Sequence, residues 1–149
     1  MTDDRQKDER RRWLAVLARA PRERLAAALD GRGGGIRVLR PAETGLVMVR
    51  GRAGGTGERF NMGEMTVSRC TVADGDGRLG IGMVAGRDRA KAELVARLDV
   101  LLQDPAQAPS LTRDLIAPLS AEQAGEQAGR AARAAATRVE FFTMVRGDV

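Results

Sequence analysis

Apolar residues near the N-terminus have the spacing of two short helices. Between positions 10 and 20 they recur at i, i+3, i+4 and i+7, which places Trp13, Val16, Leu17 and Ala20 on one helix face. Pro21 can open a second helix, because its missing N–H is not needed in the first helical turn, and the glycines of 31–35 can end it. We expect a helical hairpin over residues 10–35 with Leu25, Ala26 and Leu29 facing inward, and a frayed N-terminus over residues 1–9.

The middle of the chain has the pattern of β-strands. Runs of apolar and β-branched residues bounded by Gly and Pro predict strands at 36–40 and 45–50, and period-two alternation predicts another at 65–72. A long Gly-rich loop separates the second of these strands from the third. The sequence Asp74-Gly75-Asp76-Gly77 is a typical hairpin turn and leads into a strand at 79–85, so we expect antiparallel pairing.

The pattern returns to helices after Gly86. Asp88 is a candidate N-cap for a helix that ends before Pro105, with an apolar stripe made of Leu94, Val95, Leu98, Leu101 and Leu102. A shorter helix is expected at 110–116, capped by Ser110 and ended by Pro118. An Ala-rich helix then covers 121–136, where Glu122, Glu126 and Arg130 are spaced for ion pairing.

Residues 137–145 predict a terminal strand that is apolar on both faces, typical of a strand inside a sheet or against a partner. The prediction is therefore a single α+β domain over residues 1–149. A small, mainly antiparallel sheet would carry the N-terminal helical hairpin and the further helices packed on it.

The composition excludes several chemistries. The chain has no His and one Cys, so a Ser-His-Asp triad, a His-ligated metal, a Cys-ligated zinc site and a three-Cys iron–sulfur cluster cannot form within it. We expect no metal and no cofactor in this chain. No apolar run approaches the roughly 20 residues that span a bilayer, and a single Cys suits a reducing cytoplasm, where we expect the protein to act.

Arginine dominates the charge. The net charge is +5, and of the 25 basic residues only Lys7 and Lys91 are lysine. Guanidinium groups suit bidentate contacts with phosphate, phosphonate or carboxylate, although a GC-rich genome explains the bias as well. A basic stripe interleaved with exposed aromatics is absent, so nucleic acid is not a favoured partner.

One Gly-rich segment could contact an anion. Glycines at 54, 55 and 57 would let backbone N–H groups converge, with Arg52 and Thr56 beside them, but the lysine of a P-loop is missing. A hairpin or interface loop explains the segment equally well. The candidate anion- or partner-binding residues are Arg52, Gly54, Gly55, Thr56, Gly57, Arg69, Arg87, Arg138 and Arg146. Four carboxylates, those of Glu43, Glu58, Glu64 and Asp88, could act as acid or base only if burial shifted their pKa values. The motif G-x-G-x-x-G at 75–80 predicts a hairpin turn rather than a dinucleotide-binding site, because it leads into a strand and not into a helix.

Four blocks of sequence carry a family resemblance. They are Glu43-Thr44-Gly45-Leu46-Val47, the segment from Arg52 to Phe60, Gly86-Arg87-Asp88, and Thr137 to Gly147. With these blocks the chain resembles the G subunit of the bacterial carbon-phosphorus lyase core complex, the PhnG family. It departs from the family pattern at Ile81, Met83 and Val84, in a strand that commonly carries aromatics.

The resemblance implies a subunit that assembles with H, I and J proteins, two copies of each, in organic phosphonate catabolism. The complex transfers methylphosphonate onto the ribose of ATP and releases adenine. The nucleosidase activity belongs to the I subunit, and the iron–sulfur cluster and S-adenosylmethionine belong to the J subunit. The isolated chain is then expected to be inactive. The alternative is a self-sufficient nucleotide- or anion-binding transferase.

Overall fold

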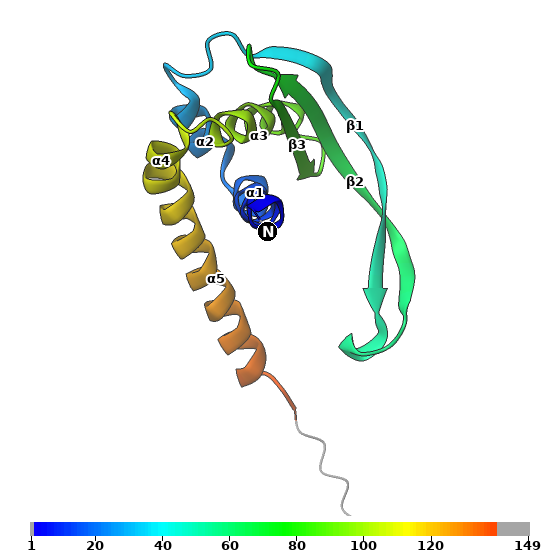
Figure 1. Ribbon diagram of the computed structural model, residues 1–149. Coiled ribbons are helices and arrows are strands. Elements are labelled where there is room, and N and C mark those ends of the chain that lie inside the picture. Colours follow the sequence, from blue (N-terminus) through cyan, green and yellow to red (C-terminus); the bar gives the residue numbers. More distant parts are fainter. Residues whose placement is uncertain (1, 140–149) are drawn as a thin grey trace, which may run out of the picture.

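The computed structural model describes residues 2–139. Helices α1 (Thr2–Arg19) and α2 (Arg22–Leu29) precede a three-stranded antiparallel sheet in the order β1-β2-β3, made of β1 (Arg37–Arg52), β2 (Arg59–Ala73) and β3 (Leu79–Ala85). Helices α3 (Arg89–Leu102), α4 (Ala108–Leu111) and α5 (Ala117–Ala136) follow, and a π-helical turn at Thr112–Ile116 joins the last two. The α+β class is confirmed (Figure 1).

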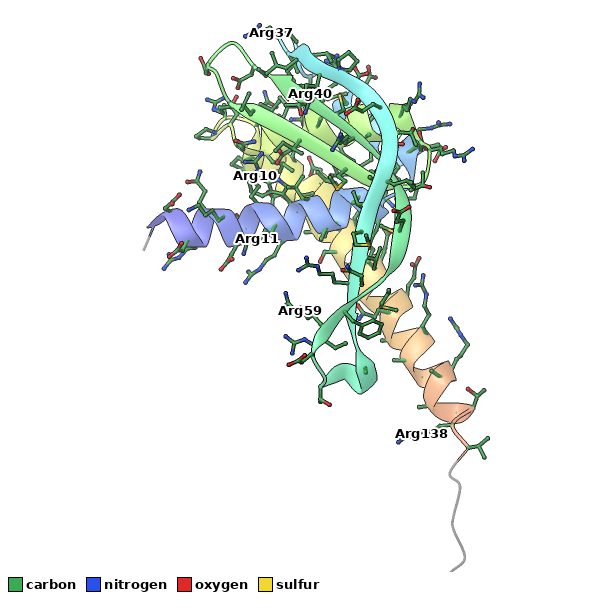
Figure 2. The ribbon with its side chains drawn as sticks, turned by 90° about the vertical axis from the view of Figure 1, so that its right-hand side faces the viewer. Arg10, Arg11, Arg37, Arg40, Arg59 and Arg138 are labelled. Atoms are coloured by element: carbon green, nitrogen blue, oxygen red, sulfur yellow. The ribbon has the colours of Figure 1, made fainter. Side chains whose placement is uncertain are left out.

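All the helices lie on one side of the sheet. Helix α3 packs on β3 and β2, and α1 and α2 pack against α3. Among residues 2–139 the core is aliphatic with a single aromatic, Trp13, and its largest fully buried side chains include Leu17, Leu25, Leu98, Leu111 and Leu119. Figure 2 looks onto the opposite face of the sheet, and no helix crosses in front of the strands there.

Two glycines let α3 approach β3 closely. A methyl group placed on Gly82 would overlap the carbonyl oxygen of Ala92, and one on Gly80 would overlap that of Ala96. Both alanines are fully buried. The helix backbone therefore lies directly on the strand backbone, with no room for side chains at these two positions of β3.

A buried carboxylate ties α1 to this helix and strand. Asp99 of α3 is 0% exposed and accepts hydrogen bonds from Trp13 Nε1 at 2.8 Å and from Arg10 Nε and Nη2 at 3.2 and 2.7 Å. It also accepts one from the backbone N–H of Ile81 at 2.9 Å. Because an unpaired buried charge is costly, these four bonds hold α1, β3 and α3 in one arrangement.

The N-terminal helix begins earlier than expected. Residues 2–9, predicted to be frayed, continue α1 as helix. Asp3 and Asp4 lie in its first turn, where negative charge is favourable, and Asp3 pairs with Lys7 one turn later. Helix α2 matches its prediction with Leu25 buried, but Ala26 is exposed rather than inward.

The two strands predicted at 36–40 and 45–50 form one long strand instead. Register shifts against β2 occur between Val38 and Arg40 and between Arg40 and Glu43, and these bulges absorb Pro41. Proline is tolerated there because β1 is an edge strand, on which an N–H need not join the ladder. The predicted long Gly-rich loop is correspondingly short, because Gly51, Arg52 and Arg59 already belong to the ladder.

Predictions for the later helices hold for α3 and fail at Pro118. Asp88 caps α3 by accepting from the N–H of Lys91 at 3.0 Å, and the helix ends before Pro105 as predicted. Pro118 does not end a helix, because the π-helical turn before it alters the backbone hydrogen bonding and places Pro118 in the first turn of α5. Ser110 is not a cap either, since its hydroxyl donates to the carbonyl of Gln107.

The predicted terminal strand falls mostly on residues 140–145, which lie outside the described residues, and residues 138–139 are not strand.

Replacing Gly82 with Ala should lower the free energy of unfolding by about 1–3 kcal/mol, because the new methyl group forces α3 away from β3. Urea unfolding followed by Trp13 fluorescence measures this. The matched control is Gly75→Ala, since nothing lies within 4 Å of that position, and it should change stability by less than about 0.5 kcal/mol. Equal stability of the two variants would contradict the close approach.

Replacing Asp99 with Ala should cost roughly 3 kcal/mol, because it leaves the donors of Arg10 and Trp13 without their acceptor. The same urea titration tests this against Glu43→Ala, which removes an exposed ion pair with Arg69 and should cost less than about 1 kcal/mol. An Asp99 variant as stable as the Glu43 variant would show that the buried bonds do not hold α1.

Candidate functional site

The far end of the β1–β2 hairpin projects beyond the rest of the sheet. Strand β3 pairs with β2 only from Val67 to Ala73. Residues 46–65, which we call the distal hairpin, are therefore a two-stranded ribbon, with no third strand beside it among residues 2–139. Both figures show it extending away from the helices that cover the sheet, and α5 extends from the same end of the molecule (Figures 1 and 2).

Three arginines gather near the tip of the distal hairpin. Arg52 lies directly opposite Arg59 in the ladder, and Arg50 lies opposite Asn61. Opposed residues in an antiparallel pair share a face, with Cβ atoms about 4.5–5.5 Å apart, and like charges in that position are destabilising. None of the three guanidinium groups has an ion pair or hydrogen bond with another side chain of residues 2–139. The tip thus concentrates positive charge at a cost to the isolated chain.

The glycines of the tip serve the turn first. Gly54 and Gly55 have φ values of 60° and 79°, in the left-handed region where glycine is favoured. The N–H groups of Thr56 and Gly57 both donate to the carbonyl oxygen of Ala53, at 3.4 and 3.1 Å. These two donors are occupied within the turn, so the glycine segment is a hairpin tip and not a cradle of converging N–H groups.

An apolar face runs along the distal hairpin on the side away from the arginine pair. Phe60 lies opposite Gly51, and a side chain on Gly51 would overlap Met62, so Met62 lies over the same face. Phe60, Met62 and Met65 are 48%, 64% and 43% exposed. The same side of the sheet continues into exposed Leu79, Ile81 and Met83 of β3. Within residues 2–139 nothing covers this face (Figure 2).

The other predicted anion-binding residues lie away from the tip. Arg69 is ten residues from Arg59 along β2, roughly 33 Å at about 3.3 Å per residue, and its guanidinium pairs with Glu43 at 2.9 Å. Arg87 is exposed in the loop before α3, and Arg138 is exposed just beyond α5. Arg146 lies outside the described residues. The structure therefore brings together Arg52 and the tip segment 54–57, and separates them from Arg69.

The predicted acid–base candidates are in contact with solvent or serve the fold. Glu58 and Glu64 are exposed, Glu43 pairs with Arg69, and Asp88 caps α3 and pairs with Arg22 at 3.4 Å. No group of three His, Cys, Asp or Glu side chains among residues 2–139 is placed to hold a metal ion. The search for helices long and apolar enough to span a membrane, made over the same residues, finds none.

Two groups with shifted pKa values, Cys70 and Asp74, have structural roles. Burial raises the pKa of the Cys70 thiol, whose Sγ donates to the carbonyl of Arg40 at 3.4 Å. Partial desolvation alone would raise the pKa of Asp74. The hydrogen bonds from the backbone and side chain of Arg78 outweigh it and hold that pKa below its usual value. Asp74 thereby fixes the β2–β3 turn.

A hollow of about 560 Å³ lies between the end of α1 and α5, lined by Arg19, Gln123, Glu126, Gln127 and Arg130. It is open to solvent, and Arg130 and Glu126 pair within it at 3.8 Å. Its lining holds no buried titratable group, and Arg130 is already paired there, whereas the arginines of the hairpin tip have no ion pair among residues 2–139, so the distal hairpin remains the better candidate site.

Reading the sequence alone missed part of this site. It selected Arg52 but not its cross-strand neighbour Arg59, because their pairing depends on the register shift between Val49 and Arg50. The apolar face was missed as well, since alternation shows that residues share a face and not whether that face is covered. The signal that was available is the placement of Arg50, Arg52 and Arg59 on both sides of one Gly-rich turn.

Two comparisons with known proteins bear on this site. The family model described as "Phosphonate metabolism protein PhnG" matches residues 8–147. A relative from Rhizobium meliloti (strain 1021), named alpha-D-ribose 1-methylphosphonate 5-triphosphate synthase subunit PhnG, is 44% identical over 149 residues, covering 99% of this chain and 95% of that protein. The match includes the distal hairpin and the helices that support the sheet. The chain belongs to the PhnG family of phosphonate metabolism proteins.

Proposed function

We propose that this chain is a subunit of the cytoplasmic carbon-phosphorus lyase core complex, in which it assembles with H, I and J subunits, two copies of each. The observation that carries the proposal is the distal hairpin, whose arginine cluster and apolar face have no partner among residues 2–139. The relative that is 44% identical is named as a synthase subunit, which supports the same role.

In this role the chain supports the transfer of methylphosphonate onto the ribose of ATP with release of adenine. The nucleophile of this transfer is an oxygen of methylphosphonate. The chain has no imidazole, its one thiol is buried with a raised pKa, and its candidate carboxylates are exposed or serve the fold, so we assign the acid–base groups of the reaction to other subunits. The iron–sulfur cluster and S-adenosylmethionine of the later cleavage belong to the J subunit. What this chain can contribute is position: it orders a partner's site through contacts made by its projecting segments.

A self-sufficient transferase receives less support. Nucleotide binding by the glycine segment would need free N–H groups beside Arg52, whereas those of Thr56 and Gly57 donate to Ala53. Calorimetry of the isolated chain with ATP tests the alternative. Saturable binding that is lost in Arg52→Ala would favour it over the subunit role.

Adding the chain to the purified I, H and J subunits should produce an eight-subunit species. With ATP and methylphosphonate it should shift the products from ribose triphosphate to the methylphosphonate adduct. Size-exclusion chromatography and phosphorus NMR of the products measure the two effects. The control is the same mixture without the chain, and the isolated chain alone should form no adduct. If the chain neither co-elutes with the other subunits nor changes the product ratio, the proposed function is wrong.

A further inference from the structure

We infer that the distal hairpin, residues 46–65, is a docking arm that inserts against another protein subunit. That subunit would present an apolar surface to the face of Phe60, Met62 and Met65, and carboxylates to Arg50, Arg52 and Arg59. The inference rests on the proposed function, which supplies the partner, and it assigns the contact to one segment of this chain.

The ribbon has little support from the described residues of its own chain. Beyond Val67 it has two strands, and among residues 2–139 no third strand pairs with it and the hairpin extends beyond the helices that cover the sheet (Figure 1). A two-stranded hairpin is marginally stable in water unless its apolar face is buried. Leu46 and Met48, on the arginine side, are also 64% and 54% exposed, so both faces of the ribbon present large apolar groups to solvent. Such a segment gains its support from a partner.

The apolar surface is also oriented outward in β3. In that strand the small residues Gly80 and Gly82 face the core, while the large residues Leu79, Ile81 and Met83 are exposed by 48%, 45% and 47%. A strand with one solvated face usually places its large apolar side chains toward the core and its small or polar residues toward solvent. Together with Met62 and Met65, this surface is rich in methionine, which adapts its shape to a facing surface. The uncovered face of the sheet therefore continues the docking surface of the arm.

The positive charge of the hairpin tip indicates which kind of partner surface it fits. Arg52 and Arg59 are opposed in the ladder, and no carboxylate among residues 2–139 pairs with them. Arginine flanked by large apolar side chains is typical of protein interfaces, where a guanidinium fork pairs with a carboxylate. A nucleotide phosphate would also attract these arginines, but two N–H donors of the tip are engaged with Ala53, and exposed Leu46 and Met48 share the arginine face. These features favour a protein surface with acidic groups.

A second copy of this chain is a poor occupant for the same surface. A two-fold contact places the same patch on both subunits, so it would bring two clusters of Arg50, Arg52 and Arg59 toward each other. Like charges across an interface oppose association. The partner is therefore a different chain.

The test uses the four-subunit complex reconstituted from purified proteins. Two double variants change the arm: Arg52→Glu with Arg59→Glu, and Phe60→Ser with Met62→Ser. Two matched controls make the same kinds of change at the other end of β1: Arg37→Glu with Arg40→Glu, and Val38→Ser with Leu39→Ser, at residues that are likewise exposed. Figure 2 shows Arg37 and Arg40 toward the start of β1, far from Arg59 near the tip of the hairpin. Binding of each variant to the remaining subunits is measured by biolayer interferometry.

Each arm variant should bind roughly 30-fold or more weakly, the size expected for loss of interface hot spots, while the controls should stay within about threefold. Hydrogen exchange of the wild-type chain provides a second measurement that does not depend on the folding of any variant. Amides of residues 46–65 should exchange at least about tenfold more slowly in the complex than in the isolated chain.

Three outcomes would overturn the inference, and they differ in whether the proposed function also fails. If the arm variants bind like the wild type and exchange over 46–65 is unchanged, the docking arm is wrong while the proposed function stands. If both arm variants assemble normally but the arginine variant no longer shifts the products, the arginines act on an anionic substrate and not on a partner surface. If the wild-type chain binds none of the other subunits, the proposed function fails and the inference fails with it.

Discussion

The fold depends on one buried carboxylate. Asp99 has no exposed surface and is satisfied only when Arg10, Trp13 and the backbone of Ile81 occupy their present positions. A buried charge that loses its partners is far more costly than a lost surface contact, so this carboxylate specifies where α1 crosses α3 and β3. The exposed first half of α1 then extends from a fixed point, and the same assembly of helix and strand supports the base of the distal hairpin.

Close backbone packing determines which face of the sheet is left for other contacts. Since Gly80 and Gly82 bring α3 onto β3, the covered side of that strand has no space for large side chains. Val84 is the one larger side chain of β3 buried on that side, whereas Leu79, Ile81 and Met83 lie on the other side, where residues 2–139 provide no cover. The molecule has a small aliphatic core and a broad apolar outer face. That combination is typical of a chain that completes its burial in an assembly.

Much of the fold could be predicted from local signals. Asp88 begins α3, Asp74 and Gly75 mark the β2–β3 turn, and both follow from side-chain chemistry within a few residues. Two of the wrong boundaries had a shared cause: Pro41 and Pro118 were treated as breaks, whereas bulges and a π-helical turn accommodate them. The candidate site was only partly predictable. Arg52 lies in a Gly-rich segment that the sequence shows directly. Its position opposite Arg59 depends on the register of β1 against β2, which no local sequence pattern predicts.

Strand β1 also bears on the behaviour of newly made chains. It is an edge strand of 16 residues, and a long free edge is a template for uncontrolled strand pairing between copies. Pro41 removes one donor from that edge, two bulges before Glu43 interrupt its regular spacing, and Arg37, Arg40, Arg50 and Arg52 place positive charge along it. These features oppose stacking of one copy on another. A chain synthesised in excess is thereby protected from aggregation through a strand that carries the exposed residues Leu46 and Met48.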